Sequence, residues 1–426
     1  MRFSKLSLSA LLLAAVACGS SDDSGPATTF PEARSALTRV SEPIVPEADR
    51  SLFVADNAAF AVDLLRVVAV NGENTLVSPH SVSNALAMTY AGAAGSTRDD
   101  IGRALHFTLP EERLHSAFNW MDTELDKRAE NAVGRDGKAA RLNVDNELFG
   151  AVDARFTASY LDTLALNYGS GVKLLDFERA SVEATAKINR HVEERTEGRI
   201  KDLLTDPLDA NTRFVLVNTV YANAGWARPF TKASTTAGTF KTITSDVQVP
   251  MMRSSGEMAY ASDARAEVVE LALSGDQLVF DVILPKGPVA DYETTLTGGG
   301  LTQLLRAASG RLVDLTLPKF RLEPKRSTSL KAALSTLGMA SAFVAADFSR
   351  MLPGESIQLA DVVHKTFLEI DEDGLEAAAA TAVIGERSSA PLDPPVTVTV
   401  DRPFLVVLRD RPTGQILFLG HVTDPR

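Results

Sequence analysis

The four residues Ser170-Gly171-Val172-Lys173 match the S-x-x-K pattern of penicillin-binding hydrolases, in which a serine attacks a carbonyl carbon. A match to two fixed positions arises by chance in a chain of 426 residues, and the Ser-Asp-Asn and Lys-Thr-Gly partners of this pattern are absent. The G-x-S-x-G, P-loop, H-E-x-x-H and C-x-x-C patterns are absent as well. A hydrolase that uses Ser170 and Lys173 is the weakest hypothesis, and we expect no enzyme activity.

Patterns that could bind a metal are equally scarce. The run from Glu369 to Gly374 imitates the start of a calcium loop, but Ala380 stands where that loop needs its last glutamate. The six histidines are scattered, and a single cysteine allows neither an internal disulfide nor a cysteine-based zinc site. We therefore expect no metal and no other cofactor.

The segment from Asp371 to Pro395 has the least ordinary composition. An acidic turn leads into an alanine-rich run from Leu375 to Glu386, and three prolines follow. The alanines favour a helix, whereas residues 381–384, Thr-Ala-Val-Ile, favour a strand. In a strand, the face that carries Leu375 has no charge. The segment could lie in a sheet or form an exposed loop, and a switch by strand insertion requires both states.

The overall composition limits the possible partners. With 45% apolar and 23% charged residues the chain is typical of a soluble globular protein. Its net charge of −12 argues against a nucleic-acid partner, which needs a basic face, and against activation by a polyanion.

The N-terminus has the pattern of an export signal. An apolar run from Leu6 to Ala17 is too short to span a bilayer, which takes ~20 residues. It ends before Cys18 and resembles the lipobox of bacterial lipoproteins, in which the cysteine is lipidated after cleavage. We expect a signal peptide over residues 1–17 and a lipid anchor at Cys18 as the only contact with a membrane. Gly19 suits an outer-membrane destination in the cell envelope; a plain secretory signal would make the protein extracellular.

The rest of the chain predicts a tether and one domain. Residues 18–48 are rich in small polar residues and proline, which predicts a flexible tether. Residues 49–426 contain no second linker and no repeat. Apolar residues have helical spacing in the first half, and later segments such as 278–284 and 396–400 have strand patterns. Helices followed mostly by strands predict the α+β class.

Short motifs occur in a fixed order over almost the whole globular part. They are Asn74–Ser81 with Leu86-Ala87-Met88, Phe214–Asn218 with Gly225–Phe230, Leu317–Phe320, Leu337–Ser349, His364-Lys365 with Glu372–Gly374, and Arg402–Phe404 with Phe418–Val422. Each motif is weak alone, but together they resemble the serpin family and leave little room for chance.

This resemblance implies the serpin fold, with three β-sheets, about nine α-helices and an exposed reactive-centre loop at about residues 372–395. It also implies a single-use inhibitor that acts as a monomer. A serine protease cuts the loop and remains bound as a covalent acyl-enzyme. The cut loop then inserts into the central sheet, and the protease is carried to the opposite end and distorted.

The resemblance further assigns three groups of residues to this mechanism. In the hinge, small side chains let the strand enter without overpacking. Leu375 departs from the usual Thr or Ser and the occasional Val, so we expect its bulk to slow the first step and let part of the loop be cleaved without trapping. The groups are the hinge (Glu372, Gly374, Leu375, Glu376, Ala377, Ala378, Ala379, Ala380 and Thr381), the shutter (Ser78, Ser81, Asn218 and His364) and the breach (Trp226 and Lys319).

Two bonds are candidates for the cut. Counting sixteen residues from Glu372, one fewer than the family's usual seventeen, places it between Arg387 and Ser388, whereas the usual count places it between Ser388 and Ser389. We favour Arg387-Ser388, because a trypsin-like pocket recognises arginine through charge-assisted bonds. The Ser388-Ser389 bond would suit an elastase-like or subtilisin-like enzyme.

Three functional classes follow. The first is an inhibitor of serine proteases, more often trypsin-like ones. The second is a non-inhibitory serpin fold that acts as a carrier or chaperone, or a protease substrate that traps nothing, and Leu375 is the feature that favours it. The third is the hydrolase described above.

Overall fold

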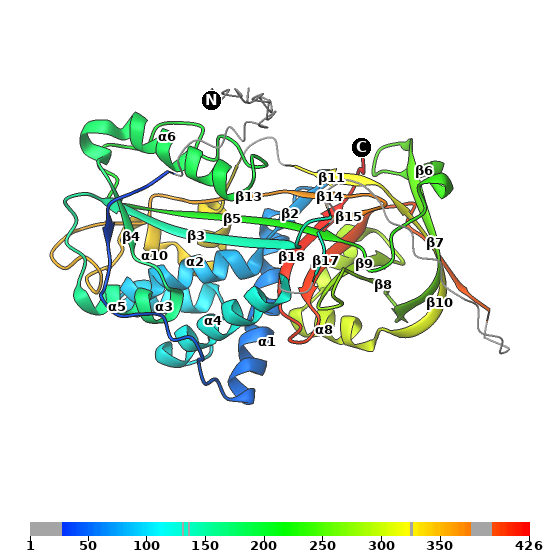
Figure 1. Cartoon of the computed structure of the whole chain (residues 1–426), viewed down its shortest axis with the longest axis horizontal. Coiled ribbons are helices and arrows are strands. Elements are labelled where there is room, and N and C mark those ends of the chain that lie inside the picture. Colours follow the sequence, from blue (N-terminus) through cyan, green and yellow to red (C-terminus); the bar gives the residue numbers. More distant parts are fainter. Residues whose placement is uncertain (1–27, 130–131, 135–136, 324–326, 376–393) are drawn as a thin grey trace, which may run out of the picture.

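The computed structural model of the chain describes residues 28–426 except 130–131, 135–136, 324–326 and 376–393. Ten α-helices lie in this part, and six of them are in its first half (Figure 1). None of the described helices has both the length and the apolar character that crossing a bilayer requires. The helices are α1 (Glu47–Val68), α2 (Pro79–Gly92), α3 (Gly95–Ala104), α4 (Glu111–Asp126), α5 (Ala158–Tyr168), α6 (Phe177–Arg195), α7 (Val289–Thr295), α8 (Gly298–Ala307), α9 (Lys331–Leu334) and α10 (Ser341–Val344).

The long sheet contains most of the predicted site. Its strands follow the order β1-β4-β3-β5; β13 then pairs in parallel with the first part of β5, and β15 pairs antiparallel with its end. β14 and β11 continue the sheet beyond β15. Figure 1 shows α6 above this sheet and α2 below it. The strands are β1 (Glu32–Ala33), β3 (Arg141–Ala151), β4 (Val172–Leu175), β5 (Phe214–Gly225), β11 (Phe320–Leu322), β12 (Thr328–Ser329), β13 (Val362–Thr366), β14 (Leu368–Ile370) and β15 (Gly374–Leu375).

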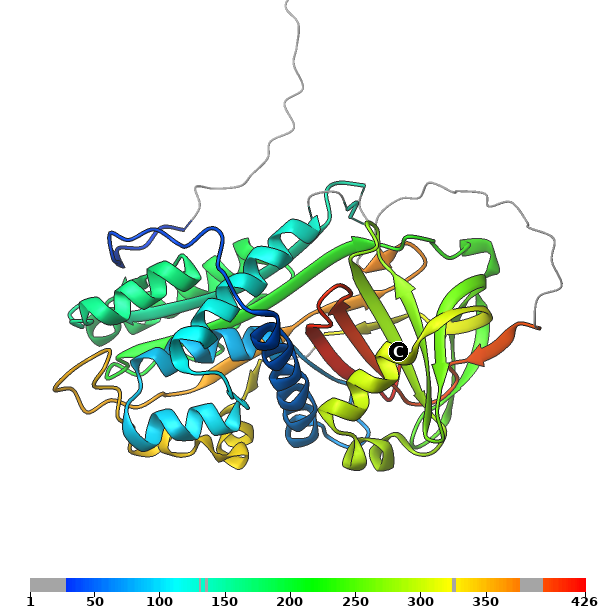
Figure 2. The same cartoon turned by 90° about the horizontal axis from the view of Figure 1, so that it is seen from below.

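The other strands form two further sheets, which share β7 and lie at one end of the molecule (Figure 2). The order β2-β18-β17-β9-β8-β7 makes one sheet, and β16-β10-β7-β6 makes the other. The predicted strands at 278–284 and 396–400 are β9 and β16. The α+β class and the three predicted sheets are confirmed. These strands are β2 (Thr75–Val77), β6 (Thr236–Lys241), β7 (Asp246–Ser262), β8 (Ala266–Ala272), β9 (Leu278–Pro285), β10 (Ser309–Pro318), β16 (Val396–Thr399), β17 (Phe404–Asp410) and β18 (Ile416–Val422).

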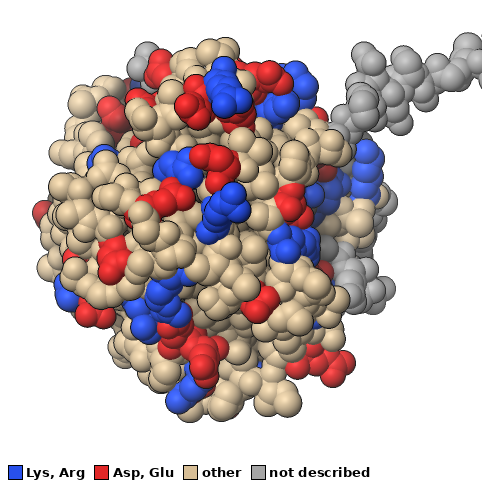
Figure 3. Space-filling model, turned by 90° about the vertical axis from the view of Figure 1, so that its left-hand side faces the viewer, with Lys and Arg blue, Asp and Glu red and all other residues tan. Residues whose placement is uncertain are grey.

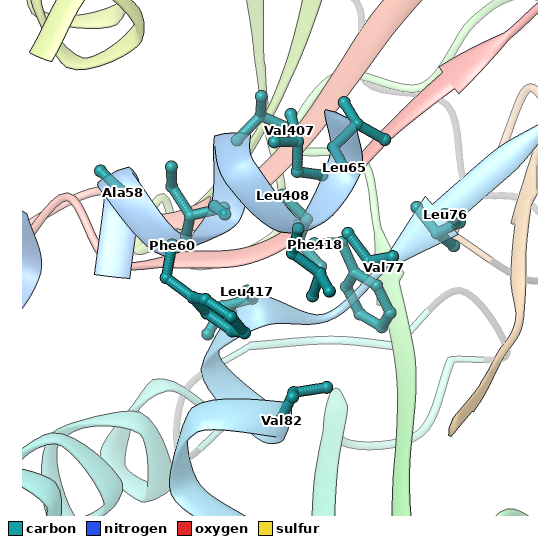
Figure 4. Close-up of a cluster of buried hydrophobic side chains, with 14 of the residues drawn as sticks. Ala58, Phe60, Leu65, Leu76, Val77, Val82, Val407, Leu408, Leu417 and Phe418 are labelled. Atoms are coloured by element: carbon teal, nitrogen blue, oxygen red, sulfur yellow. The ribbon is translucent and has the colours of Figure 1, made fainter. Parts of the chain in front are cut away.

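The main core joins α1 to the sheet that contains β18. Figure 4 shows Phe60 of α1, Val77 of β2, and Leu417 and Phe418 of β18 within one cluster of buried side chains. Close packing of apolar side chains makes such a region resist deformation. The N-terminus of α2 follows β2 directly, so the polar residues at the start of α2 stand on a rigid support.

Residues 28–46 pack against the domain, whereas the sequence predicts a flexible tether as far as residue 48. β1 pairs antiparallel with β4. Phe30 contacts the rings of Phe149 and His191 edge to face, with centroids 5.3 and 5.4 Å away. The composition of this segment gives no sign of a core, but pairing with an open sheet edge depends on backbone groups, which composition does not report.

Charged side chains of both signs alternate on the face that Figure 3 presents, which is the end of the molecule that bears α5 and α6. Among the described residues visible there, no broad basic area is present. This face therefore offers little attraction to a polyanion.

Candidate functional site

A buried polar cluster lies where β5, β13, β3 and α2 meet. Asn218 and His364 are 0% and 2% exposed, and His364 Nδ1 lies 2.7 Å from Asn218 Oδ1. The Ser78 backbone N–H donates to His364 Nε2 over 3.1 Å. The Asn218 amide donates to Ser81 Oγ and to Asn146 Oδ1. The four residues predicted as a shutter thus lie together, and Asn146, which was not predicted from the sequence, joins them.

These contacts fix the protonation of His364. The ring accepts a hydrogen bond at Nε2, so it is neutral and carries its proton on Nδ1, from which it donates to Asn218. Complete burial lowers the pKa of His364 to about 4. A second proton would face the Ser78 N–H, so the cluster tolerates only the neutral ring.

Asn146 reaches the cluster through the pairing of β3 with β5, which sets it directly opposite Asn218. Sequence reasoning missed it because the two residues are far apart in the chain. One signal was present: asparagine is uncommon in strands, and Asn146 precedes the apolar end of β3.

The chain reverses direction between β14 and β15. The Asp371 N–H donates to Gly374 O over 3.2 Å, and the Asp373 N–H donates to Asp371 Oδ1 over 2.8 Å. Trp226 holds this turn at two points: its Nε1–H donates to Asp371 O over 2.8 Å and its backbone N–H donates to Asp373 O over 3.0 Å. The turn is therefore fixed to the end of β5, from which Trp226 follows.

Glu372, at the tip of this turn, is only 4% exposed. Its carboxylate lies 2.7 Å from Lys319 Nζ and accepts a hydrogen bond from Thr235 Oγ1 over 2.7 Å. Its carbonyl oxygen accepts from the Phe230 N–H over 2.8 Å. Burial raises the pKa of Glu372, but the bonds from Lys319 and Thr235 outweigh burial and hold that pKa below its ordinary value. Lys319, which the resemblance assigns to the breach, is thus paired with Glu372 of the hinge; the Glu372 side chain is buried and that of Lys319 is 35% exposed. Thr235 and Phe230 are partners that the sequence did not reveal.

Two further contacts complete this end of the sheet. Lys232 Nζ lies 2.7 Å from the Asp373 carboxylate. The Trp226 ring packs edge to face against Phe230 and Phe280, with centroids 6.1 and 5.9 Å away. Lys232 and Phe280 were not named from the sequence, because only the folded sheets bring them to the turn.

The first two residues after the turn lie between two strands. Gly374 and Leu375 are opposite Gly225 and Ala224 of β5, and Leu375 is also opposite Ile370 of β14. β15 is antiparallel to both neighbours. Leu375, which departs from the small or polar residue usual at this position, is 1% exposed and belongs to the main core.

The other predicted site residues fall outside the described part of the chain. They are Cys18, the hinge residues Glu376, Ala377, Ala378, Ala379, Ala380 and Thr381, and the candidate cleavage residues Arg387, Ser388 and Ser389.

The two residues of the S-x-x-K pattern have separate partners. Ser170 Oγ donates to Gly171 O over 3.1 Å, and Lys173 Nζ is paired with Glu147. The arrangement does not supply the contact between a nucleophile and its base that acyl transfer needs.

Comparisons with known proteins agree on one family. The family described as Serpin (serine protease inhibitor) matches residues 55–425. The uncharacterized serpin-like protein TK1782 of Thermococcus kodakarensis is 34% identical over 94% of this chain and 92% of its own. Human leukocyte elastase inhibitor is 32% identical over 87% of this chain and 98% of its own. The crystal structure of human thyroxine-binding globulin complexed with thyroxine superposes with a TM-score of 0.77 and 30% identity, over 88% of this chain and 99% of that one.

Proposed function

This chain belongs to the serpin family, and from that membership we propose that it is an inhibitor of serine endopeptidases that acts as a suicide substrate. It is not an enzyme and needs no cofactor. Its partner is a serine protease, which it binds as a monomer through a covalent bond.

The covalent step uses the chemistry of the protease. The serine oxygen of the protease attacks the carbonyl carbon of the residue before the cut, and the peptide bond breaks. The amine of the next residue leaves with a proton from the protease histidine, and an ester joins the loop to the protease. Hydrolysis would release the protease, so the cut loop must insert into the sheet before water attacks the ester.

The position of β15 is the observation that carries this proposal. β15 already runs in the direction of an inserted strand, with β5 on one side and β14 on the other. Further down the sheet, β5 and β13 still pair directly, from Leu216–Val362 to Val220–Thr366. An inserting strand would continue from Leu375 and separate these five pairs.

The register of β15 predicts where each loop residue arrives. Six steps along the strand from Leu375 and six steps back along β5 from Ala224 place Thr381 opposite Asn218. Six residues back from Ile370, the partner of Leu375 on the other side, is His364, which is opposite Asn218 in the intact sheet. Thr381 would therefore enter between these two residues and replace their hydrogen bond with its own hydroxyl.

The target follows from the bond that is cut. We favour cleavage between Arg387 and Ser388 and hence a trypsin-like protease, because the arginine would fill a pocket that ends in a carboxylate. Cleavage between Ser388 and Ser389 would suit an elastase-like enzyme. The likeness to human leukocyte elastase inhibitor supports the Ser388-Ser389 bond as the alternative.

The protein acts outside the cytoplasm in this proposal. The signal-like segment over residues 1–17 supports export, and Cys18 supports a lipid anchor in the cell envelope; without lipidation the protein would be extracellular. There it would protect the envelope against proteases.

A second candidate is a non-inhibitory carrier. The likeness to thyroxine-binding globulin favours it, and so does the expectation from the sequence alone that the bulk of Leu375 hinders the first step of insertion. The alanines from Ala377 to Ala380 favour the inhibitor, since a carrier has no need of a loop that can enter a sheet.

The test is to mix the protein with trypsin, elastase and subtilisin and run a denaturing gel. A band at the summed mass of inhibitor and protease that survives detergent supports the inhibitor. Complete cleavage without such a band by all three enzymes contradicts it and leaves the carrier or simple substrate.

A further inference from the structure

We propose that Leu375 is a positioning residue that starts strand insertion before the loop is cut, so that the severed loop extends a strand already present. This inference rests on the proposed inhibitory function. It reverses the expectation from the sequence, which treats the bulk of Leu375 as an obstacle to the first step.

The sheet is already open at this end. Direct pairing between β5 and β13 stops at Val220 and Thr366. Beyond that point the next partner of β5 on this side is β15, at Ala224, and β15 in turn pairs with Ile370. The separation of two strands, which insertion requires at its start, is therefore complete in the intact molecule.

Leu375 is what occupies the opening. Its side chain is 1% exposed and lies in the same buried cluster as Trp226, Phe320 and Ile370. An apolar side chain removed from water holds β15 in place. Serine or threonine there would bury less apolar surface, so the departure from the usual residue strengthens the docked state.

Gly374 makes the docking possible. It has a φ of +148°, which favours glycine, and a Cβ at this position would collide with Ala224 O and lie 2.7 Å from Gly225 Cα. Any side chain at residue 374 would push β15 away from β5. A substitution here releases Leu375 without changing the leucine itself.

The experiment compares Leu375→Ala, Leu375→Met and Gly374→Ala with the unchanged protein. The loop is cut with an endopeptidase that is not trapped, and the gain of resistance to urea is followed in time. We expect Leu375→Ala and Gly374→Ala to gain resistance about tenfold more slowly, and Leu375→Met to stay within about twofold, because methionine retains most of the buried surface. If Leu375 is only an obstacle, Leu375→Ala relaxes faster. Faster or equal relaxation overturns the inference.

A second measurement examines the uncut protein. Trp120 and Trp226 are the only tryptophans, so Trp120→Phe leaves Trp226 beside the turn as the single reporter. We expect Leu375→Ala and Gly374→Ala to shift its emission to longer wavelength, and an unchanged emission overturns the docked state. If the unchanged protein traps no protease and gains no resistance to urea when cut, the proposed function fails. The Trp226 emission of the uncut protein would then still test whether β15 is docked. If it traps protease while Leu375→Ala relaxes normally, only this inference fails.

Discussion

Asn218 and His364 join β5 to β13 through a 2.7 Å hydrogen bond, on the line along which the two strands would have to separate. Both residues are buried, and each has a second partner on another element: Asn146 on β3 for Asn218, and the backbone of Ser78 for His364. A strand that enters here breaks one bond of each residue, and it must offer a polar group in return, because an unpaired buried group is costly.

The first prediction concerns pH. The pKa of His364 is about 4 in the folded protein, against 6.5 for the free side chain, because burial excludes the charged form. Below pH 6.5 the His364 ring is protonated in the unfolded chain but stays neutral in the native state. The free energy of unfolding therefore falls by about 3 kcal/mol as the pH falls from 6.5 to 4. Above pH 7 this contribution is constant. Urea unfolding midpoints over this range measure it.

The control is His364→Gln, which keeps a polar side chain and cannot titrate. Its stability should depend less steeply on pH between 6.5 and 4 than that of the unchanged protein. Equal slopes of stability against pH for the two proteins would show that the pKa of His364 is not lowered in the native state.

The second prediction tests the register of insertion. Residue 377 would lie opposite Ala222 and Leu368, which are both in the main core. Ala377→Glu should therefore lower the trapped fraction of protease about tenfold or more, because burying an unpaired carboxylate costs several kcal/mol. Ala379→Arg, on the same face, should behave alike. The ratio of trapped to cleaved inhibitor on a denaturing gel measures the effect.

Ala378→Glu is the matched control. Residue 378 would lie opposite Tyr221 and Phe367 on the other face, and the Arg199 and Arg321 side chains lie over the Phe367 ring, 5.8 and 5.0 Å from its centroid. A carboxylate there meets positive charge, so trapping should persist. Normal trapping by Ala377→Glu, or equal loss in both variants, would rule out this register.

Part of the site could be predicted from the sequence. Ser78, Ser81, Asn218 and His364 are named by their motifs, and the structure brings them together. The contacts within the cluster could not be inferred from the sequence. Ser78 contributes its backbone N–H, and Asn146 reaches the cluster only through the pairing of β3 with β5. Such pairing depends on long-range register, which local patterns do not determine.

The start of the hinge shows the same limit. The alternation from Leu375 onward identifies an uncharged face, but it does not say whether the segment lies in a sheet or outside it. Gly374 and Leu375 lie in the sheet because β5 and β14 are separated there, and because the contacts of Glu372 with Lys319 and Thr235 fix the preceding turn. An exposed ion pair would contribute little, whereas the Glu372 carboxylate in this pair is nearly buried.

The third prediction concerns the free energy stored in the intact molecule. After a cut near residue 387 by an endopeptidase that is not trapped, the loop should insert and gain hydrogen bonds to β5 on one side and to β14 and β13 on the other. The nicked protein should then melt at least about 10 °C above the intact one, since each kcal/mol shifts the midpoint by about 2–4 °C in a large domain. Ala377→Glu, nicked at the same bond, should show little or no gain. A nicked unchanged protein that melts no higher than the intact one contradicts insertion.

The fourth prediction identifies the cleaved bond. If trypsin is trapped through Arg387, the C-terminal peptide released by denaturation begins at Ser388, and Arg387→Ala should slow trypsin trapping about a hundredfold or more. The reason is that a pocket built to bind a charged group leaves its own carboxylate unpaired when that group is missing. Elastase serves as the comparison, because its inhibition should change little if it cuts after Ser388. N-terminal sequencing of the peptide and progress curves with each enzyme measure both effects. A peptide that begins at Ser389 after reaction with trypsin would move the reactive bond one residue along and remove Arg387 as the determinant of specificity.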